Sequence, residues 1–157
     1  KSLYAWGFFG PPQSVVNYMK VPIKNTPNVI FAECDIKINQ IGFCGMGLLK
    51  STTGSFEQIP FCIEFGNHAH FYYDLGSQEK RWDNDGYAPM QWYRLTFKFD
   101  KLNKCVFIWV NGLLVAEDSA PELSDNCYDT FYLSAGGGHS EGGSAYFDNV
   151  RIWTVKE

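Results

Sequence analysis

The chain has 157 residues, of which 45% are hydrophobic, 17% aromatic and 19% charged, and its formal net charge is −4. This length suffices for one sizeable core and no composition shift marks a linker, so we expect a single domain over residues 1–157. Because the sequence has neither clustered Lys and Arg nor an apolar run approaching about 18 residues, we expect it neither to bind nucleic acid nor to insert into a membrane.

The first predicted strands lie in residues 3–9, 28–38 and 41–49. Residues 3–9 are rich in aromatic side chains and end before two prolines, which cannot continue a ladder, so we expect an edge or terminal strand. Residues 28–38 have the two-residue alternation of a strand with one buried face. Repeated glycines in residues 41–49 indicate a bulge or a close approach of two backbones. The side chains expected to point outward from residues 28–38 are Phe31, Glu33, Asp35 and Lys37.

Residues 59–65 and 70–75 flank a short turn and predict a hairpin. We expect a polar loop from residue 76 to residue 90. The clearest pattern follows in residues 92–100 and 105–115, where alternating apolar side chains predict a second hairpin. Asn111-Gly112 supplies the positive φ angles of a tight turn at its far end.

The last part of the chain predicts a loop with one helical turn at residues 121–126, strands at residues 130–134 and 145–153, and a glycine-rich loop between them. Short strands at this spacing, without helical periodicity, indicate an all-β sandwich of two antiparallel sheets.

Five cysteines occur without Cys-x-x-Cys spacing, which argues against a zinc ribbon or a thioredoxin-type redox pair. Cys34 falls in the buried register of its strand, where a free thiol acts as a small hydrophobic side chain. The sequence leaves the pairing of the five open.

Four stretches in the second part of the chain resemble a known family. They read Trp-x-x-Leu-x-Phe-x-Phe-Asp from Trp92, Phe-Ile-Trp-Val-Asn-Gly-Leu-Leu-Val from Phe107, Phe-Tyr-Leu-Ser-Ala-Gly-Gly from Phe131 and Tyr-Phe-Asp-Asn-Val-Arg-Ile-Trp from Tyr146. Their order and spacing resemble the concanavalin A-like lectin and glucanase jelly roll, especially its laminin-G-like branch. The resemblance implies a jelly-roll sandwich that binds carbohydrate, mediates adhesion or cleaves glycans, outside the cell or at the cell surface.

The alternation places Phe107 and Trp109 on the outer face of their strand. One interpretation is a platform on which the rings stack against sugars. The other is that the aromatic amino-terminal segment or a loop covers them.

Outward carboxylates offer an enzymatic alternative. Several of them, with Arg94, are expected to lie together on one sheet, and two carboxylates can cleave a glycosidic bond. Yet Ile38 stands where family members that cleave β-glucans have the second glutamate of Glu-x-Asp-x-x-Glu, and the strands expected of alginate-lyase relatives are missing. We therefore favour solvated carboxylates. The carboxylates considered are Glu33, Asp35, Glu64 and Asp74.

Two metal sites are considered. His68 and His70 are close in sequence and suggest a transition-metal site. The predicted turn, however, places His68 in or beside the hairpin loop, so the two side chains need not point the same way. Asp83 and Asp85 provide oxygen ligands of the kind that calcium prefers, although they also build plain turns. By resemblance to related β-sandwich binding modules, Asp148 is the candidate ligand of a structural Ca²⁺ ion.

The sequence therefore predicts a non-catalytic glycan-binding or adhesive module whose partner is a glycan or cell-surface polysaccharide. Two alternatives stay open: a polysaccharide hydrolase or lyase, and a subunit of a filament or coat that self-associates through its amino-terminal strand. The predicted ligand-binding residues are Trp82, Asp83, Asp85, Tyr87, Arg94 and Trp109.

Overall fold

The computed structural model describes residues 3–7, 9–10, 13–14, 17–25, 27–40, 43–50, 61–65, 71–75, 78–82, 86–119, 128–136 and 143–155. All regular elements in these ranges are strands. No helix long and apolar enough to cross a membrane occurs among them.

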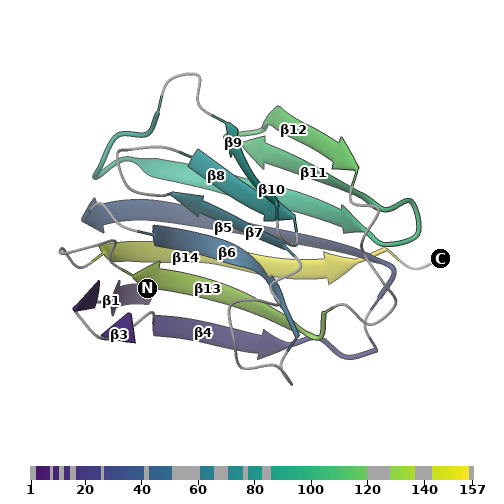
Figure 1. Ribbon diagram of the computed structural model, residues 1–157, viewed down its shortest axis with the longest axis horizontal. Coiled ribbons are helices and arrows are strands. Elements are labelled where there is room, and N and C mark those ends of the chain that lie inside the picture. Colours follow the sequence, from purple (N-terminus) through teal and green to yellow (C-terminus); the bar gives the residue numbers. More distant parts are fainter. Residues whose placement is uncertain are drawn as a thin grey trace.

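Two six-stranded antiparallel sheets form the fold and lie one behind the other in Figure 1. The first sheet has the order β1 (Leu3–Gly7), β14 (Gly143–Thr154), β5 (Val29–Gln40), β10 (Trp92–Asp100), β11 (Cys105–Val110) and β12 (Leu113–Ser119). The second has the order β4 (Asn17–Pro22), β13 (Thr130–Gly136), β6 (Phe43–Leu49), β7 (Phe61–Phe65), β8 (Phe71–Leu75) and β9 (Gln78–Trp82). A separate two-stranded ribbon joins β2 (Phe9–Gly10) to β3 (Gln13–Ser14). The predicted all-β sandwich of two antiparallel sheets is confirmed.

The core lies between the two sheets and follows from the alternation of the central strands. Every second residue of β5 from Ile30 to Ile38 is 0% exposed, as are Leu95, Phe97 and Phe99 of β10. From the second sheet, the Phe61 ring packs edge-on against Phe97 with a centroid distance of 4.8 Å. Aromatic packing of this kind adds to the burial of apolar area that drives folding.

Two turns of the first sheet have the predicted chemistry. Asn111 and Gly112 adopt φ angles of 51° and 79°, which turn β11 tightly into β12. Between β10 and β11, the buried carboxylate of Asp100 accepts hydrogen bonds from the backbone and side-chain nitrogens of Asn103, both at 3.0 Å. The turn side chains thus satisfy backbone donors that the ladder leaves free.

The predicted hairpin of the second sheet is confirmed, since β7 and β8 pair antiparallel. The prediction of a continuous loop over residues 76–90 is wrong, because β9 pairs with β8 as an edge strand. Its sequence, Gln-Glu-Lys-Arg-Trp, has no apolar alternation, and an edge strand can be this polar. The turn with His68 and His70 and the loop at residues 121–126 lie outside the described residues.

The β6 glycines mark the predicted close approach of two backbones. A Cβ atom on Gly45 would lie 1.9 Å from the backbone oxygen of Ile63, and one on Gly47 would lie 2.3 Å from that of Phe61. On the same side of the second sheet, Tyr132 and Ser134 point away from the core, yet they are only 0% and 1% exposed. This part of the second sheet's outer face is therefore covered.

Three of the cysteines that the structure describes are free thiols, namely Cys34, Cys44 and Cys105. Cys34 is buried as predicted, and its sulfur lies 3.5 Å from that of Met46. Burial raises the pKa of Cys34 well above its usual range and that of Cys44 to about 12, so both thiols stay protonated and act as core side chains.

Replacing Gly45 with Ala should lower the free energy of unfolding by about 1–3 kcal/mol, because the β6–β7 ladder must shift to admit the new Cβ atom. Urea unfolding measures this change. Leu102→Ala is the control: Leu102 is 60% exposed in a turn, and its truncation should change stability by less than about 0.5 kcal/mol. Equal stabilities of the two variants would contradict the close approach.

Candidate functional site

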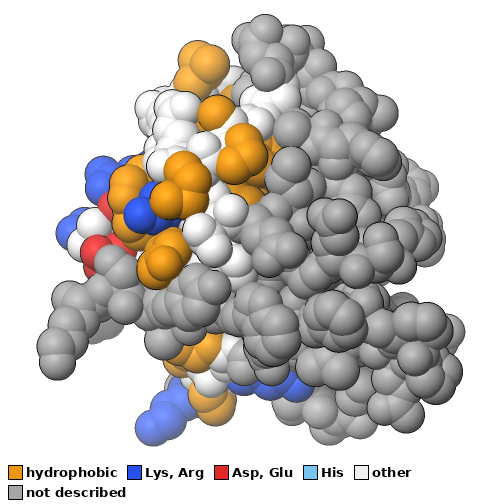
Figure 2. Space-filling view, turned by 90° about the vertical axis from the view of Figure 1, so that its left-hand side faces the viewer, with side chains coloured by type: hydrophobic (Ala, Val, Ile, Leu, Met, Phe, Trp, Pro, Cys, Tyr) orange, Lys and Arg blue, Asp and Glu red, His pale blue; other side chains and the backbone are white. Residues whose placement is uncertain are grey.

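The outer face of the first sheet carries a continuous described surface, which we call the outer platform. It consists of the side chains of four neighbouring strands that alternate with the buried residues. Figure 2 views the molecule from the left-hand side of Figure 1, and hydrophobic side chains lie next to Lys or Arg side chains in the described part of that view. The members of the outer platform are Phe31, Glu33, Asp35, Lys37, Trp92, Arg94, Thr96, Lys98, Phe107, Trp109, Tyr146, Asp148, Asn149, Arg151 and Trp153.

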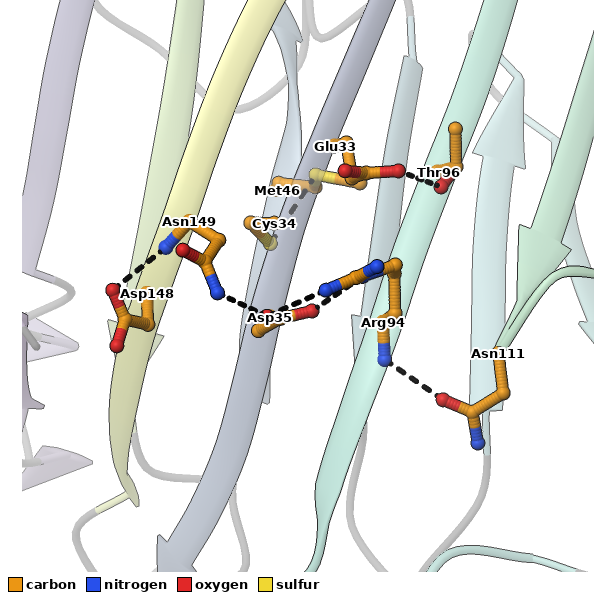
Figure 3. Close-up of polar contacts among 9 residues, drawn as sticks. All are labelled: Glu33, Cys34, Asp35, Met46, Arg94, Thr96, Asn111, Asp148 and Asn149. Atoms are coloured by element: carbon orange, nitrogen blue, oxygen red, sulfur yellow. Dashed lines mark hydrogen bonds and ion pairs between the residues drawn. The ribbon is translucent and has the colours of Figure 1, made fainter.

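A polar network occupies the middle of the outer platform (Figure 3). Arg94 donates from Nε to Asp35 Oδ1 at 2.8 Å and from a terminal nitrogen to Oδ2 at 3.1 Å, a bidentate pair. Asn149 donates to the same Oδ2 at 2.6 Å. On the far side, the backbone nitrogen of Arg94 donates to Asn111 Oδ1 at 2.9 Å. Three strands are thereby tied together at one carboxylate, and the β11–β12 turn is joined to them through the backbone of Arg94.

A bulge in β14 aims Asn149 at this network. The register of β14 against β5 shifts between Asp148 and Arg151, and Asn149 adopts a φ of 51°. Asparagine tolerates this left-handed conformation better than most residues because its short side chain bonds locally. The Asp148 carboxylate stabilises the bulge by accepting the Asn149 N–H at 2.8 Å.

The network lowers the pKa of Asp35. The hydrogen bond from Arg94 is the largest cause; burial opposes it, and the hydrogen bond from Asn149 and the Arg94 charge lower the pKa further. A glycosidase acid needs a carboxyl group whose pKa is raised, so that it carries a proton near neutral pH. Asp35 is held ionised and cannot fill that role.

Two aromatic pairs lie on one side of the Asp35–Arg94 row along the strands. The rings of Phe31 on β5 and Trp153 on β14 stack with centroids 5.3 Å apart and an interplanar angle of 9°. Phe107 and Trp109, both on β11, stack at 6.0 Å and 20°. Between the pairs, Thr96 donates its hydroxyl to Glu33 at 3.1 Å. Trp153 is 40% exposed, so part of its ring faces solvent.

Two lysines of the outer platform lie over ring faces. The Lys37 ammonium is 5.1 Å from the ring centroid of Trp92 and 4.6 Å from that of Tyr146. The Lys98 ammonium is 5.1 Å from the Phe107 centroid, and it also pairs with Asp100 at 2.9 Å. Such contacts hold a flexible lysine in one position.

The sequence-predicted ligand residues are only partly brought together. Arg94 and Trp109 lie on neighbouring strands of the outer platform, whereas Trp82 ends β9 in the other sheet. Tyr87 is 6% exposed and packs edge-on against Phe65, so it belongs to the core and not to the predicted surface. Asp83 and Asp85 lie outside the described residues.

The position of β1 argues against the amino-terminal strand as the cover of Trp109, whereas coverage by a loop is not tested. In the first sheet β1 pairs with β14, and β14, β5 and β10 separate it from β11.

The four candidate catalytic carboxylates do not share a site. Glu33 and Asp35 lie on β5 in the first sheet, whereas Glu64 lies on β7 and Asp74 on β8 in the second. Glu33 and Asp35 lie on one sheet with Arg94, as expected for several members of the set, whereas Glu64 and Asp74 lie on the other sheet, whose outer face points in the opposite direction.

Among the described residues, no group of three or more His, Cys, Asp or Glu could hold a metal ion, and His68, His70, Asp83 and Asp85 lie outside that part of the chain. Asp148 lies at the β14 bulge and bonds to Asn149. A structural Ca²⁺ ion at Asp148 stays a prediction.

Sequence reasoning missed the cross-strand groupings on the outer platform, namely Phe31 with Trp153 and Lys37 with Trp92 and Tyr146. Strand alternation gave the signal that Phe31 and Lys37 point outward. It did not show that β14 and β10 lie on either side of β5, because that order is a tertiary property.

Neither a scan against protein-family models nor a search of the curated proteins finds a match. Among solved structures, a sialidase matches with a TM-score of 0.68 and 11% identity, over 95% of this chain and 17% of its own. A structure from the endo-acting O-glycanases by which prominent members of the human gut microbiota initiate mucin breakdown matches with 0.66 and 12%, over 99% of this chain and 80% of that one.

A tetrameric galectin from the ball sponge Cinachyrella sp. matches with a TM-score of 0.60 and 11% identity, over 88% of this chain and all of its own. These likenesses show that the chain has the jelly-roll fold. The laminin-G-like branch stays a prediction.

The lowered pKa of Asp35 predicts an acid-sensitive contribution to stability. The unfolded carboxyl titrates near about pH 3.9, so the stabilisation is complete well above that value and is lost as the pH falls through the lower, folded-state pKa. Between pH 6 and pH 2 (about the range of carboxyl titration), Asp35→Asn should therefore lose less stability than the unmodified protein does. Urea unfolding at a series of pH values measures the difference.

Asp100→Asn is the matched comparison for this pH series. Burial alone would raise the pKa of Asp100, but hydrogen bonds from Asn103 and Lys98 lower it, so Asp100→Asn should also flatten the acid response. An Asp35→Asn profile parallel to that of the unmodified protein would show that the Arg94 pair does not form in solution.

Proposed function

We propose that the outer platform binds a glycan and that the chain is a non-catalytic glycan-binding module. The observation that carries this proposal is the pairing of stacked rings with a fixed polar network on one sheet face. Trp109 on β11 and Trp153 on β14 offer flat rings, and Asp35 and Arg94 lie on the two strands between these, β5 and β10, one cross-strand row beyond Trp109.

The two parts of the outer platform suit the two surfaces of a sugar. A ring face covers the apolar C–H face of a pyranose, while carboxylate oxygens accept and guanidinium nitrogens donate hydrogen bonds to its hydroxyl groups. Arg94 donates two hydrogen bonds to Asp35. Its side chain is 51% exposed, so its remaining N–H groups can donate to a ligand.

Preorganisation favours this function further. The ring stacks and the Asp35 network fix side chains that would otherwise lose rotamer freedom on binding, so less of the contact energy is spent on ordering them. A flat face still gives weak individual contacts, and multivalent display would strengthen them.

The setting that we propose is a module of a larger secreted or cell-surface protein. The chain spans only 17% of the length of the sialidase that it matches. Two further matched structures carry the names of endo-acting O-glycanases that initiate mucin breakdown and of a tetrameric galectin. These names support a glycan as the ligand class.

Glycan cleavage is the second candidate function, and its place would be the second sheet. There the register sets Asp74 opposite Cys62 and Tyr72 opposite Glu64, so Glu64 and Asp74 occupy diagonal positions on neighbouring strands. On the outer platform, the lowered pKa of Asp35 argues against this carboxyl group as the general acid of a glycosidase.

A glycan array should yield ligands of the unmodified protein, and Trp109→Ala or Trp153→Ala should weaken their binding at least about tenfold, as expected for loss of a central aromatic contact. Leu102→Ala, which removes an exposed apolar side chain outside the outer platform, is the control. Running the array with and without calcium tests the ion predicted at Asp148.

A reducing-end assay on each ligand separates binding from cleavage. Product release that Glu64→Gln abolishes would contradict a non-catalytic module and support the second candidate. Ligands whose affinity is unchanged in both tryptophan variants would remove the outer platform as their site.

A further inference from the structure

Lys37 lies at the centre of a row of three side chains that cross the first sheet. In the backbone register it is opposite Trp92 of β10 on one side and Tyr146 of β14 on the other. Its ammonium nitrogen lies 5.1 Å from the Trp92 ring centroid and 4.6 Å from the Tyr146 centroid. Two ring faces from two different strands therefore fix one cation in place.

The charge of Lys37 has no carboxylate counterpart among the described residues. The ion pairs in that part of the chain use Lys50, Arg94 and Lys98. Asp35, the next carboxylate along the same face of β5, is bonded to Arg94 and Asn149 (Figure 3). Ring faces attract a cation but accept little from its three N–H donors, so Lys37 is poised to bind an anion.

We infer that Lys37, flanked by Trp92 and Tyr146, forms a subsite for the carboxylate of an acidic sugar. This inference rests on the proposed glycan-binding function and adds a ligand class to it. The sugar carboxylate pairs with the ammonium group, and the apolar face of the same sugar covers a neighbouring ring. Trp92 is 41% exposed, so its ring is within reach of a ligand.

Lys98 supplies a matched control. It too lies over a ring, 5.1 Å from the centroid of Phe107, but its ammonium is already paired with Asp100 at 2.9 Å. Replacing either lysine with Met keeps most of the apolar stem and removes the charge. Only the change at Lys37 should therefore alter the preference for an acidic ligand.

The test measures affinities for two pairs of probes. Within each pair, one member carries sugar carboxylates and the other does not. Tetragalacturonate is compared with its methyl ester, and sialyllactose with lactose, so that a carboxylate within a chain is distinguished from one at a terminal sugar. The unmodified protein should prefer the acidic member of at least one pair by about two- to fivefold, the size of one partly exposed ion pair. Lys37→Met should abolish this preference, whereas Lys98→Met should keep it.

The outcomes separate this inference from the function on which it rests. Equal binding of acidic and neutral probes, or a preference that survives in Lys37→Met, overturns the acidic-sugar subsite and leaves glycan binding intact. An array on which no glycan binds the unmodified protein overturns both. The thermal unfolding of Lys37→Met and Lys98→Met shows whether each variant is folded.

Discussion

The whole arrangement depends on the strict alternation of side chains along β5. Every second residue from Ile30 to Ile38 is fully buried, and the residues between them point away from the core. A slip of one residue would exchange the two sets and place Asp35 in the interior, at a cost of several kcal/mol for each uncompensated charge. The buried row therefore fixes which side chains the outer platform can present.

Asp35 then connects the strands of the outer platform. It takes two hydrogen bonds from Arg94 on β10 and one from Asn149 at the β14 bulge, so one ionised carboxylate orders both neighbouring strands. Much of its charge is compensated within the chain, whereas Lys37 is compensated by ring faces alone among the described residues. Under the proposed glycan-binding function, this asymmetry gives the outer platform one preferred position for an anion.

Sequence patterns predicted the strands whose buried and exposed side chains alternate. They did not predict contacts between residues that are distant in the sequence. The alternation in residues 92–100 identified the side of this strand that is buried. It also correctly predicted that Arg94 points away from the core, as the alternation in residues 105–115 did for Trp109. Tyr87 could not be placed, because its burial against Phe65 joins segments without a shared pattern. The polar edge strand β9 has no alternation to detect, and the grouping of Lys37 with Trp92 and Tyr146 follows from the strand order β14-β5-β10.

The central claim is that a glycan binds to the outer face of the first sheet, and an NMR titration tests it most directly. The indole N–H signals of Trp92, Trp109 and Trp153 report on three parts of the outer platform, whereas the amide signals of β7 and β13 report on the second sheet. Titration with the tightest glycan ligand should shift the indole signals and leave β7 and β13 unchanged. Shifts confined to β7 and β13, with all three indoles unmoved, would contradict the account.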